Sequence, residues 1–253
     1  MTVAQAVAWQ VIVDAQGRSG PENMAIDEAL LEEADRTGDA FLRLYRWDPP
    51  CLSFGRNEPA ATRYDRASLE RRGIAVVRRP TGGRAVWHDQ EVTYAVAAPI
   101  SRFGSLRQSY CAIHERLAAA LRSLGAGATL ASNRPSAHPP LRHGPCFSSP
   151  VGGEVLVNGR KVIGSAQVRR GTALLQHGSI LLDGSQEIVR EVSRQPSAVS
   201  GETSLREALG RPVTFDEVAE AVVRHWGGSV VPAVPRLYPP SPAFADPAWT
   251  WRR

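Results

Sequence analysis

A single lysine, Lys161, stands in a chain that otherwise uses arginine for its basic side chains. Lysine and arginine together number 30, and 29 of them are arginine. Arginine stays protonated near neutral pH, whereas a partly buried lysine can lower its pKa and take part in chemistry. The one ammonium group kept in so arginine-rich a chain makes Lys161 a candidate catalytic residue.

Three cysteines, Cys51, Cys111 and Cys146, are candidate nucleophiles. Their number is odd and no two have CxxC spacing, which argues against a disulfide framework and against a zinc site. A free thiol has a pKa of about 8.5, so only a small fraction is thiolate near neutral pH unless a nearby cation favours it. Cys51 opens an apolar strand and Cys111 lies beside the apolar stripe of a helix, so we expect structural roles for both.

The segment RRPTGGRAVWHD, at 78–89, combines two glycines with flanking arginines after a predicted strand. The glycines permit a tight turn and let backbone N–H groups approach a ligand closely. The arginines Arg78, Arg79 and Arg84 could hold a carboxylate or a phosphate. Taken alone, this pattern fits a plain surface turn about as well.

Strands and helices of ordinary length must position these residues. Apolar alternation between turn residues predicts strands over 8–14, 41–47, 51–55, 74–79, 91–98, 154–168 (with a hairpin turn) and 173–182. Helical spacing of apolar residues predicts helices over 22–35, 66–72, 105–124, 185–193 and 215–226. We therefore expect one α+β domain, followed from about Val230 by an extended, proline-rich tail.

Three local features bear on function. Residues 132–153, which include Cys146, are rich in proline, glycine, serine and histidine and predict a long loop, and such loops tend to be functional. Asn158-Gly159 predicts a hairpin turn just before Lys161. Asn23 and Asp27 share the inward face of helix 22–35, where a structural hydrogen-bond network is the more common outcome and support of a site the less common one.

Five segments resemble, in order along the chain, motifs of the superfamily of lipoate ligases, octanoyltransferases and biotin ligases. They are NMAIDEALL at 23–31, LRLYRWDPPCLSFGRNEP at 42–59, RRPTGGRAVWHD at 78–89, NGRKVIGSAQVR at 158–169 and LLQHGSILLD at 174–183. The resemblance implies a catalytic domain over 1–229, with a mixed β-sheet flanked by helices, and a C-terminal tail over 230–253.

The resemblance also implies roles for single residues. In such proteins the glycine-rich segment lines the tunnel for the fatty acyl or lipoyl chain, and the lysine of the GRK motif, here Lys161, contacts the acyl carbonyl. The implied acyl site comprises Arg78, Thr81, Gly82, Gly83, Arg84, Ala85, His88, Gly164, Ser165, Ala166 and His177. We expect His88 to orient the motif rather than to act as a base. For His177 a purely structural bond to a backbone group is an equally good expectation.

The chain looks most like the cysteine-dependent octanoyltransferase branch. In that branch the nucleophile lies in the loop before the GRK hairpin, where Cys146 stands in GPCFSSP. The glycine motif reads Gly-Gly-Arg instead of the three glycines typical of ligases, and the chain is short for the accessory domain that many ligases carry. The implied reaction moves octanoate from acyl carrier protein through Cys146 to a lysine of a lipoyl domain or glycine cleavage H protein, without cofactor, metal or ATP.

Three alternatives stay open. An ATP-dependent lipoate ligase would tolerate the loss of Cys146. A lipoyl-relay amidotransferase, which moves the acyl group between lipoyl domains, would use the same cysteine chemistry with another donor. A non-catalytic acyl-binding protein would keep only the pocket. Biotin ligase fits the glycine motif and the GRK hairpin less well.

The composition of the chain argues against several other classes of protein. With 43% hydrophobic and 22% charged residues the chain is typical of globular proteins, and no apolar run reaches the roughly 18 residues of a membrane span. The N-terminal residues lack the features of a secretory signal, so we expect a cytoplasmic protein. The net charge of +5 is spread along the chain, and no nucleic-acid motif accompanies it, so we expect neither nucleic-acid nor membrane partners.

Overall fold

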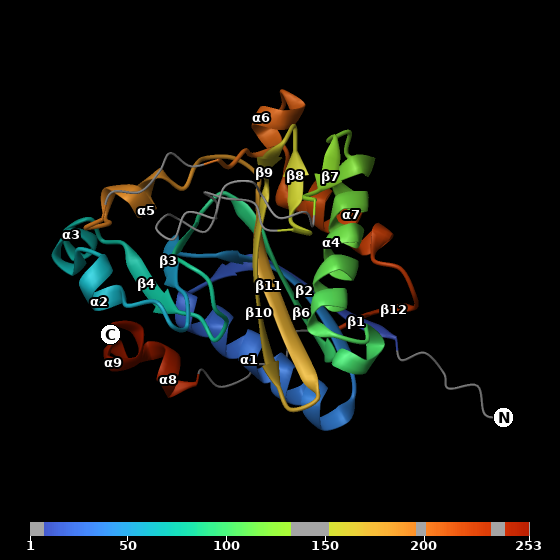
Figure 1. Ribbon diagram of the computed structural model, residues 1–253, viewed down its shortest axis with the longest axis horizontal. Coiled ribbons are helices and arrows are strands. Elements are labelled where there is room, and N and C mark those ends of the chain that lie inside the picture. Colours follow the sequence, from blue (N-terminus) through green and yellow to red (C-terminus); the bar gives the residue numbers. More distant parts are fainter. Residues whose placement is uncertain (1–7, 133–151, 196–200, 234–240, 253) are drawn as a thin grey trace.

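The computed structural model describes residues 8–132, 152–195, 201–233 and 241–252, and a six-stranded sheet lies at its centre (Figure 1). The strand order is β10-β11-β6-β2-β1-β12. The bounds are β10 Ile163–Arg170, β11 Ala173–Leu181, β6 Glu91–Pro99, β2 Ala40–Trp47, β1 Trp9–Arg18 and β12 Val230–Pro232. The first four strands pair antiparallel and the last three parallel, so the sheet is mixed, as expected.

Helices cover both faces of this sheet. Alternate residues of β2 divide between the two faces: Leu42 and Leu44 pack with α4 (Leu106–Ser123) and α7 (Phe215–His225), whereas Phe41 and Tyr45 pack with α1 (Gly20–Thr37). Successive side chains of a strand point to opposite faces, so nearly continuous apolar strands must be covered twice. The α+β architecture that the motifs implied is confirmed.

Two small sheets lie beside the central one. The first has the order β4-β3-β5, with β3 Cys51–Phe54, β4 Ala75–Arg78 and β5 Val86–His88, and shares an apolar cluster with α2 (Ala60–Arg63), α3 (Arg66–Arg71) and α5 (Glu187–Glu191). The second consists of β7 Ala128–Leu130, β8 Val155–Val157 and β9 Arg160–Lys161. Between β8 and β9, Asn158 and Gly159 have φ values of 53° and 75°, the left-handed turn that their sequence predicted.

Most long elements agree with the sequence within a few residues, and the differences concern short ones. The short helices α2 and α6 (Leu205–Leu209), the 3₁₀ turn η1 (Ile100–Arg102) and the strands β5 and β7 were not predicted. Each is three to five residues long, too short for hydrophobic periodicity to register. In the described part of the chain no helix combines the length and the apolar character needed to cross a bilayer.

The C-terminal segment differs from the expected extended tail. Val230–Pro232 forms the edge strand β12 beside β1, and α8 (Pro242–Ala245) and α9 (Pro247–Thr250) follow as short helices. Each helix has a proline in its first turn, and Phe244 is buried against α1. An extended conformation is therefore wrong for 242–250, because apolar residues within this segment bury themselves on the domain. A division of the chain at 229/230 stays a prediction.

Candidate active site

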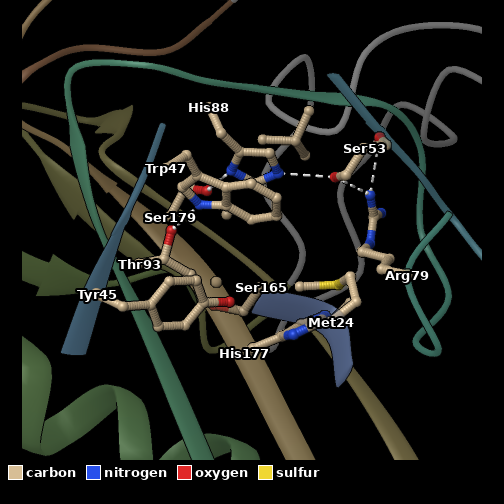
Figure 2. A pocket seen from close by; sticks show the side chains of 14 residues that line it. Met24, Tyr45, Trp47, Ser53, Arg79, His88, Thr93, Ser165, His177 and Ser179 are labelled. Carbon is tan, nitrogen blue, oxygen red and sulfur yellow. Dashed lines mark hydrogen bonds between the residues drawn. The ribbon is translucent and has the colours of Figure 1, made fainter. Parts of the chain in front are cut away.

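A pocket opens between the central sheet and the small sheet β4-β3-β5 (Figure 2). Its empty volume, which includes the open mouth, is about 340 Å³. Strands β2, β3, β5, β6, β10 and β11 contribute lining residues, and Met24 of α1 points into it. Of the residues implied by the motifs, the lining includes His88, Gly164, Ser165, Ala166 and His177.

His88 is fixed at one wall of the pocket on both ring nitrogens. Its Nδ1 lies 2.8 Å from Oε1 of Glu91 and its Nε2 lies 2.7 Å from Oγ of Ser53. The ring stacks on Trp47 with the centroids 4.0 Å apart. Figure 2 shows His88, Ser53 and Arg79 joined in one hydrogen-bonded row. A histidine with both nitrogens engaged can orient its neighbours, and the orienting role stays our prediction for it.

His177 is held by side chains. Its Nδ1 lies 2.8 Å from Oδ2 of Asp27, and its Nε2 lies 2.6 Å from Oγ1 of Thr81. Burial lowers the pKa of His177, against the opposing effect of Asp27. Asp27 also accepts hydrogen bonds from Tyr45 and Arg43. The polar residue on the apolar face of α1 therefore serves a structural network that extends directly to the pocket wall.

The glycine motif packs tightly against the small sheet. Gly83 has φ of 88°, a left-handed conformation that favours glycine. A Cβ on Gly55 would lie 1.9 Å from the carbonyl oxygen of Gly83, so glycine is required there as well. Arg79 donates to the carbonyl oxygens of Gly82 and Arg84 at 2.9 and 2.6 Å and holds the turn closed.

Arg79, which was not in the implied set, lines the pocket, and its neighbour Arg78 does not. Arg78 is fully buried and donates to main-chain carbonyls, among them those of Gly55, Glu58 and Thr250. Burial lowers the pKa of Arg78 to about 10, so it remains charged at neutral pH. Arg78 therefore lies outside the lining of the pocket, and the contact with substrate implied for it stays a prediction.

The remaining motif residues support the turn. Gly82, Gly83, Arg84 and Ala85 lie outside the pocket lining. Ala85 is buried in the apolar cluster of the small sheet, and Thr81 reaches the pocket through His177. Their implied roles in substrate binding stay predictions.

Lys161 lies on β9 with 1% of its surface exposed, and its Nζ forms an ion pair of 2.6 Å with Oε1 of Glu154. Its main-chain N–H donates to Gly201 and its carbonyl accepts from Thr203, so the strand is held from a second side. Sequence reasoning missed Glu154, which is itself 3% exposed. The sequence could have indicated this ion pair, because Glu154 and Lys161 lie on either side of the predicted hairpin turn and opposite charges across a hairpin attract each other.

His114 is the second residue that sequence reasoning missed. It lies fully buried on α4, with Nδ1 2.7 Å from the carbonyl oxygen of Gly153 and Nε2 2.8 Å from Oγ of Ser165. Burial lowers the pKa of His114 to about 4, and the charge of Lys161 acts in the same direction. The sequence could have indicated its burial, because His114 lies between Ile113 and Leu117 in a helix whose buried face includes all three.

Of the three cysteines, Cys146 lies outside the described residues. Cys51 is fully buried, and burial raises the pKa of its thiol far above the ordinary value, which makes it a poor nucleophile. Cys111 lies half-buried on α4, facing the turn at Gly153. The expected structural role of Cys51 agrees with its burial.

Comparisons with known proteins agree with these motifs. A model of the lipoyl protein ligase A/B catalytic domain matches residues 19–227. Octanoyltransferase LipM of Kyrpidia tusciae is 42% identical over 234 residues, covering 85% of this chain and 84% of that protein. Octanoyltransferase LipM of Moorella thermoacetica is 39% identical over 235 residues, covering 87% of this chain and 85% of that protein.

Solved structures share the fold at lower identity. A lipoate-protein ligase A bound with ATP aligns with a TM-score of 0.76 at 20% identity, over 91% of this chain and 90% of that one. Protein Ta0514 of T. acidophilum with bound lipoic acid gives a TM-score of 0.76 at 19% identity, over 97% of this chain and 100% of that one. Together with the match over residues 19–227 and the identities above, these results show that the chain belongs to the lipoyl protein ligase A/B catalytic domain family.

Proposed function

We propose that this protein is an octanoyltransferase of lipoate biosynthesis. It takes octanoate from a carrier-protein thioester, holds it as a thioester on Cys146 and transfers it to a lysine of a lipoyl domain or glycine cleavage H protein. The LipM octanoyltransferases among its relatives support the reaction class. The observation that carries the proposal is the placement of Lys161, the chain's single lysine, buried beside Glu154 and three residues before the pocket-lining Gly164.

The pocket suits a hydrocarbon chain. Met24, Trp47 and Val86 present apolar surface to it. Polar groups of its wall bond one another, as in the pairs His88 with Ser53 and His177 with Thr81. Polar groups satisfied within the protein do not demand a polar ligand, so the apolar surface decides what is bound.

The first half of the reaction forms an acyl-enzyme. The thiolate of Cys146 attacks the octanoyl thioester carbonyl, a new C–S bond forms, and the carrier's sulfur departs and takes up a proton. Negative charge develops on the carbonyl oxygen during this step, and the Lys161 ammonium stabilises it. Glu154 supplies the opposite charge without which a buried ammonium would be strongly disfavoured.

The second half delivers the acyl group. The neutral amine of the acceptor lysine attacks the Cys146 thioester, a C–N bond forms, and the C–S bond breaks to return the thiolate while the amine nitrogen loses a proton. Exchange between thioesters is nearly even in free energy and conversion of a thioester to an amide is downhill. The reaction therefore needs neither ATP nor a metal ion.

The partners are then a carrier protein and a lipoyl-type acceptor domain. The chain's net charge of +5 favours long-range attraction of acidic partners. A catalytic free thiol needs a reducing compartment, so we place the protein in the cytoplasm. A lipoyl-relay amidotransferase would use the same groups and differ only in its donor.

Removal of each cysteine in turn tests the proposal. Octanoyl transfer from octanoyl carrier protein to an apo lipoyl domain, measured without ATP, should fall by at least ~10³-fold in Cys146→Ala, since no acyl-enzyme can form. Cys111→Ala is the matched control and should retain the wild-type rate within ~3-fold. Undiminished transfer by Cys146→Ala would contradict the thioester route and favour an ATP-dependent ligase.

A further inference from the structure

His114 connects the wall of the pocket with the Lys161 ion pair. Its Nε2 lies 2.8 Å from Oγ of Ser165, which lines the pocket. Its Nδ1 lies 2.7 Å from the carbonyl oxygen of Gly153, the residue directly before Glu154. One buried imidazole therefore contacts both a residue that lines the pocket and the residue directly before Glu154.

The donor and acceptor capacities of these groups decide where the protons lie along the hydrogen-bonded chain that runs through His114. A carbonyl oxygen only accepts, so the contact with Gly153 requires the proton on Nδ1, and the neutral ring then accepts on Nε2 from the Ser165 hydroxyl. Ser165 has no second proton, so Tyr94 donates to Oγ of Ser165 at 2.6 Å. Gln176 donates in turn to the Tyr94 oxygen at 2.8 Å. All of these hydrogen bonds are therefore donated in the same direction, from Gln176 toward the carbonyl of Gly153.

Gly153 is the point where the hairpin that carries Lys161 begins. Its φ is 90°, and its N–H donates to Ala131 at 2.9 Å. The carbonyl of Glu154 accepts from Ala131 at 2.7 Å. Ala131, directly after β7, thus fixes this turn from one side, and His114 fixes the Gly153 carbonyl from another.

We propose that His114 is a positioning residue of the acyl-transfer site, which sets the place of the Glu154–Lys161 pair by holding the carbonyl of Gly153 from helix α4. The role rests on the octanoyl transfer proposed above. His114 takes no part in bond making, because its Nδ1 bonds Gly153 and its Nε2 is engaged by Ser165 and, at 3.3 Å, by the hydroxyl of Tyr94. Small displacements of a catalytic group cost rate, and so the contact with Gly153 matters for catalysis.

Three substitutions separate the two contacts. His114→Asn places an amide N–H where Nδ1 stands and keeps the donor to Gly153, whereas His114→Gln extends its amide to the place of Nε2 and does not. His114→Ala removes both contacts. His225→Asn is the matched control, because Nδ1 of His225 bonds a carbonyl within its own helix α7, at Ala221.

The first readout is the single-turnover rate of octanoylation from octanoyl carrier protein. We expect His114→Ala and His114→Gln to be at least ~10-fold slower than wild type, about the effect of one lost hydrogen bond. His114→Asn should stay within ~3-fold and His225→Asn should be unchanged. Wild-type rates in folded His114→Gln, or a His114→Asn variant as slow as His114→Ala, would overturn the positioning role.

The second readout does not depend on catalysis. Because Lys161 is the single lysine, brief acetylation with acetic anhydride followed by peptide mass spectrometry reports on its environment directly. We expect low labelling in wild type and His114→Asn, and labelling raised by ~5-fold or more in His114→Ala and His114→Gln, because the buried pair shifts. Equal labelling in all variants would overturn the proposal. If wild type does not octanoylate at all, the proposed function fails, and this labelling still decides the positioning.

Discussion

Lys161 and Glu154 form a buried ion pair, and their burial decides how they can act. Both side chains are at most 4% exposed, with the charged atoms 2.6 Å apart. A buried pair adds little net stability, but removing one partner leaves an uncompensated charge and is costly. We infer that the pair is kept for its position, in keeping with the stabilisation of the developing oxyanion proposed above for Lys161.

The buried His114 should make the stability of the protein depend on pH. Burial lowers its pKa to about 4 in the folded protein, from 6.5. In the unfolded chain the same ring binds a proton near pH 6.5, so between these pH values the unfolded state binds more protons. The free energy of unfolding therefore falls as the pH falls through this window, by an amount on the order of 3 kcal/mol for this residue.

Urea unfolding of wild type and His114→Asn at several pH values from about 7 to about 4 measures this effect. Wild type should lose more stability than the variant as the solution is acidified. His177, whose pKa is also lowered by burial, contributes to both proteins and cancels in the difference. A difference between the two that does not change with pH would contradict a neutral, buried His114.

At the scale of elements, Arg78 joins the C-terminal helix α9 to the small sheet. It donates to the carbonyl of Trp249 at 2.9 Å and of Gly55 at 2.6 Å. The Trp249 indole donates back to the Arg78 carbonyl at 3.2 Å. Figure 1 shows α8 and α9 near α2, and both helices contact β4. The C-terminal segment thus supports the sheet that forms one wall of the pocket.

Arg78→Lys tests this connection. An ammonium has three donors against the five of a guanidinium and lacks its fixed planar geometry, so several buried carbonyls would lose their partner. We expect unfolding by urea to show a loss of about 2–4 kcal/mol. Arg36→Lys, in an exposed ion pair with Glu33, is the control and should cost less than about 0.5 kcal/mol. Equal effects of the two substitutions would show that α9 does not depend on Arg78.

At the scale of the whole molecule, the sequence predicted what depends on periodicity and on motifs. Long strands, long helices and the hairpin at Asn158-Gly159 were correct because each buries a regular pattern of side chains. The helices of the C-terminal segment were missed because their burial comes from Phe244 packing on distant α1. Local sequence does not reveal such contacts.

The site was predicted in part for the same reason. His88, His177 and Ser165 lie on the pocket because motif residues share its walls. Glu154 and His114 were missed because their partners come from elsewhere in the fold. Which of Arg78 and Arg79 lines the pocket was not predicted, because the direction of adjacent side chains depends on which side of the chain is covered. The role of Cys146 as the nucleophile stays a prediction, and the proposed acyl-enzyme depends on it.

Intact mass spectrometry after mixing the protein with octanoyl carrier protein, without ATP, tests this role most directly. We expect one octanoyl adduct that maps to Cys146 and disappears when an apo lipoyl domain is added, with the acyl group recovered on the domain's lysine. Absence of any adduct, together with lipoylation once ATP and free lipoate are supplied, would contradict it and identify a ligase.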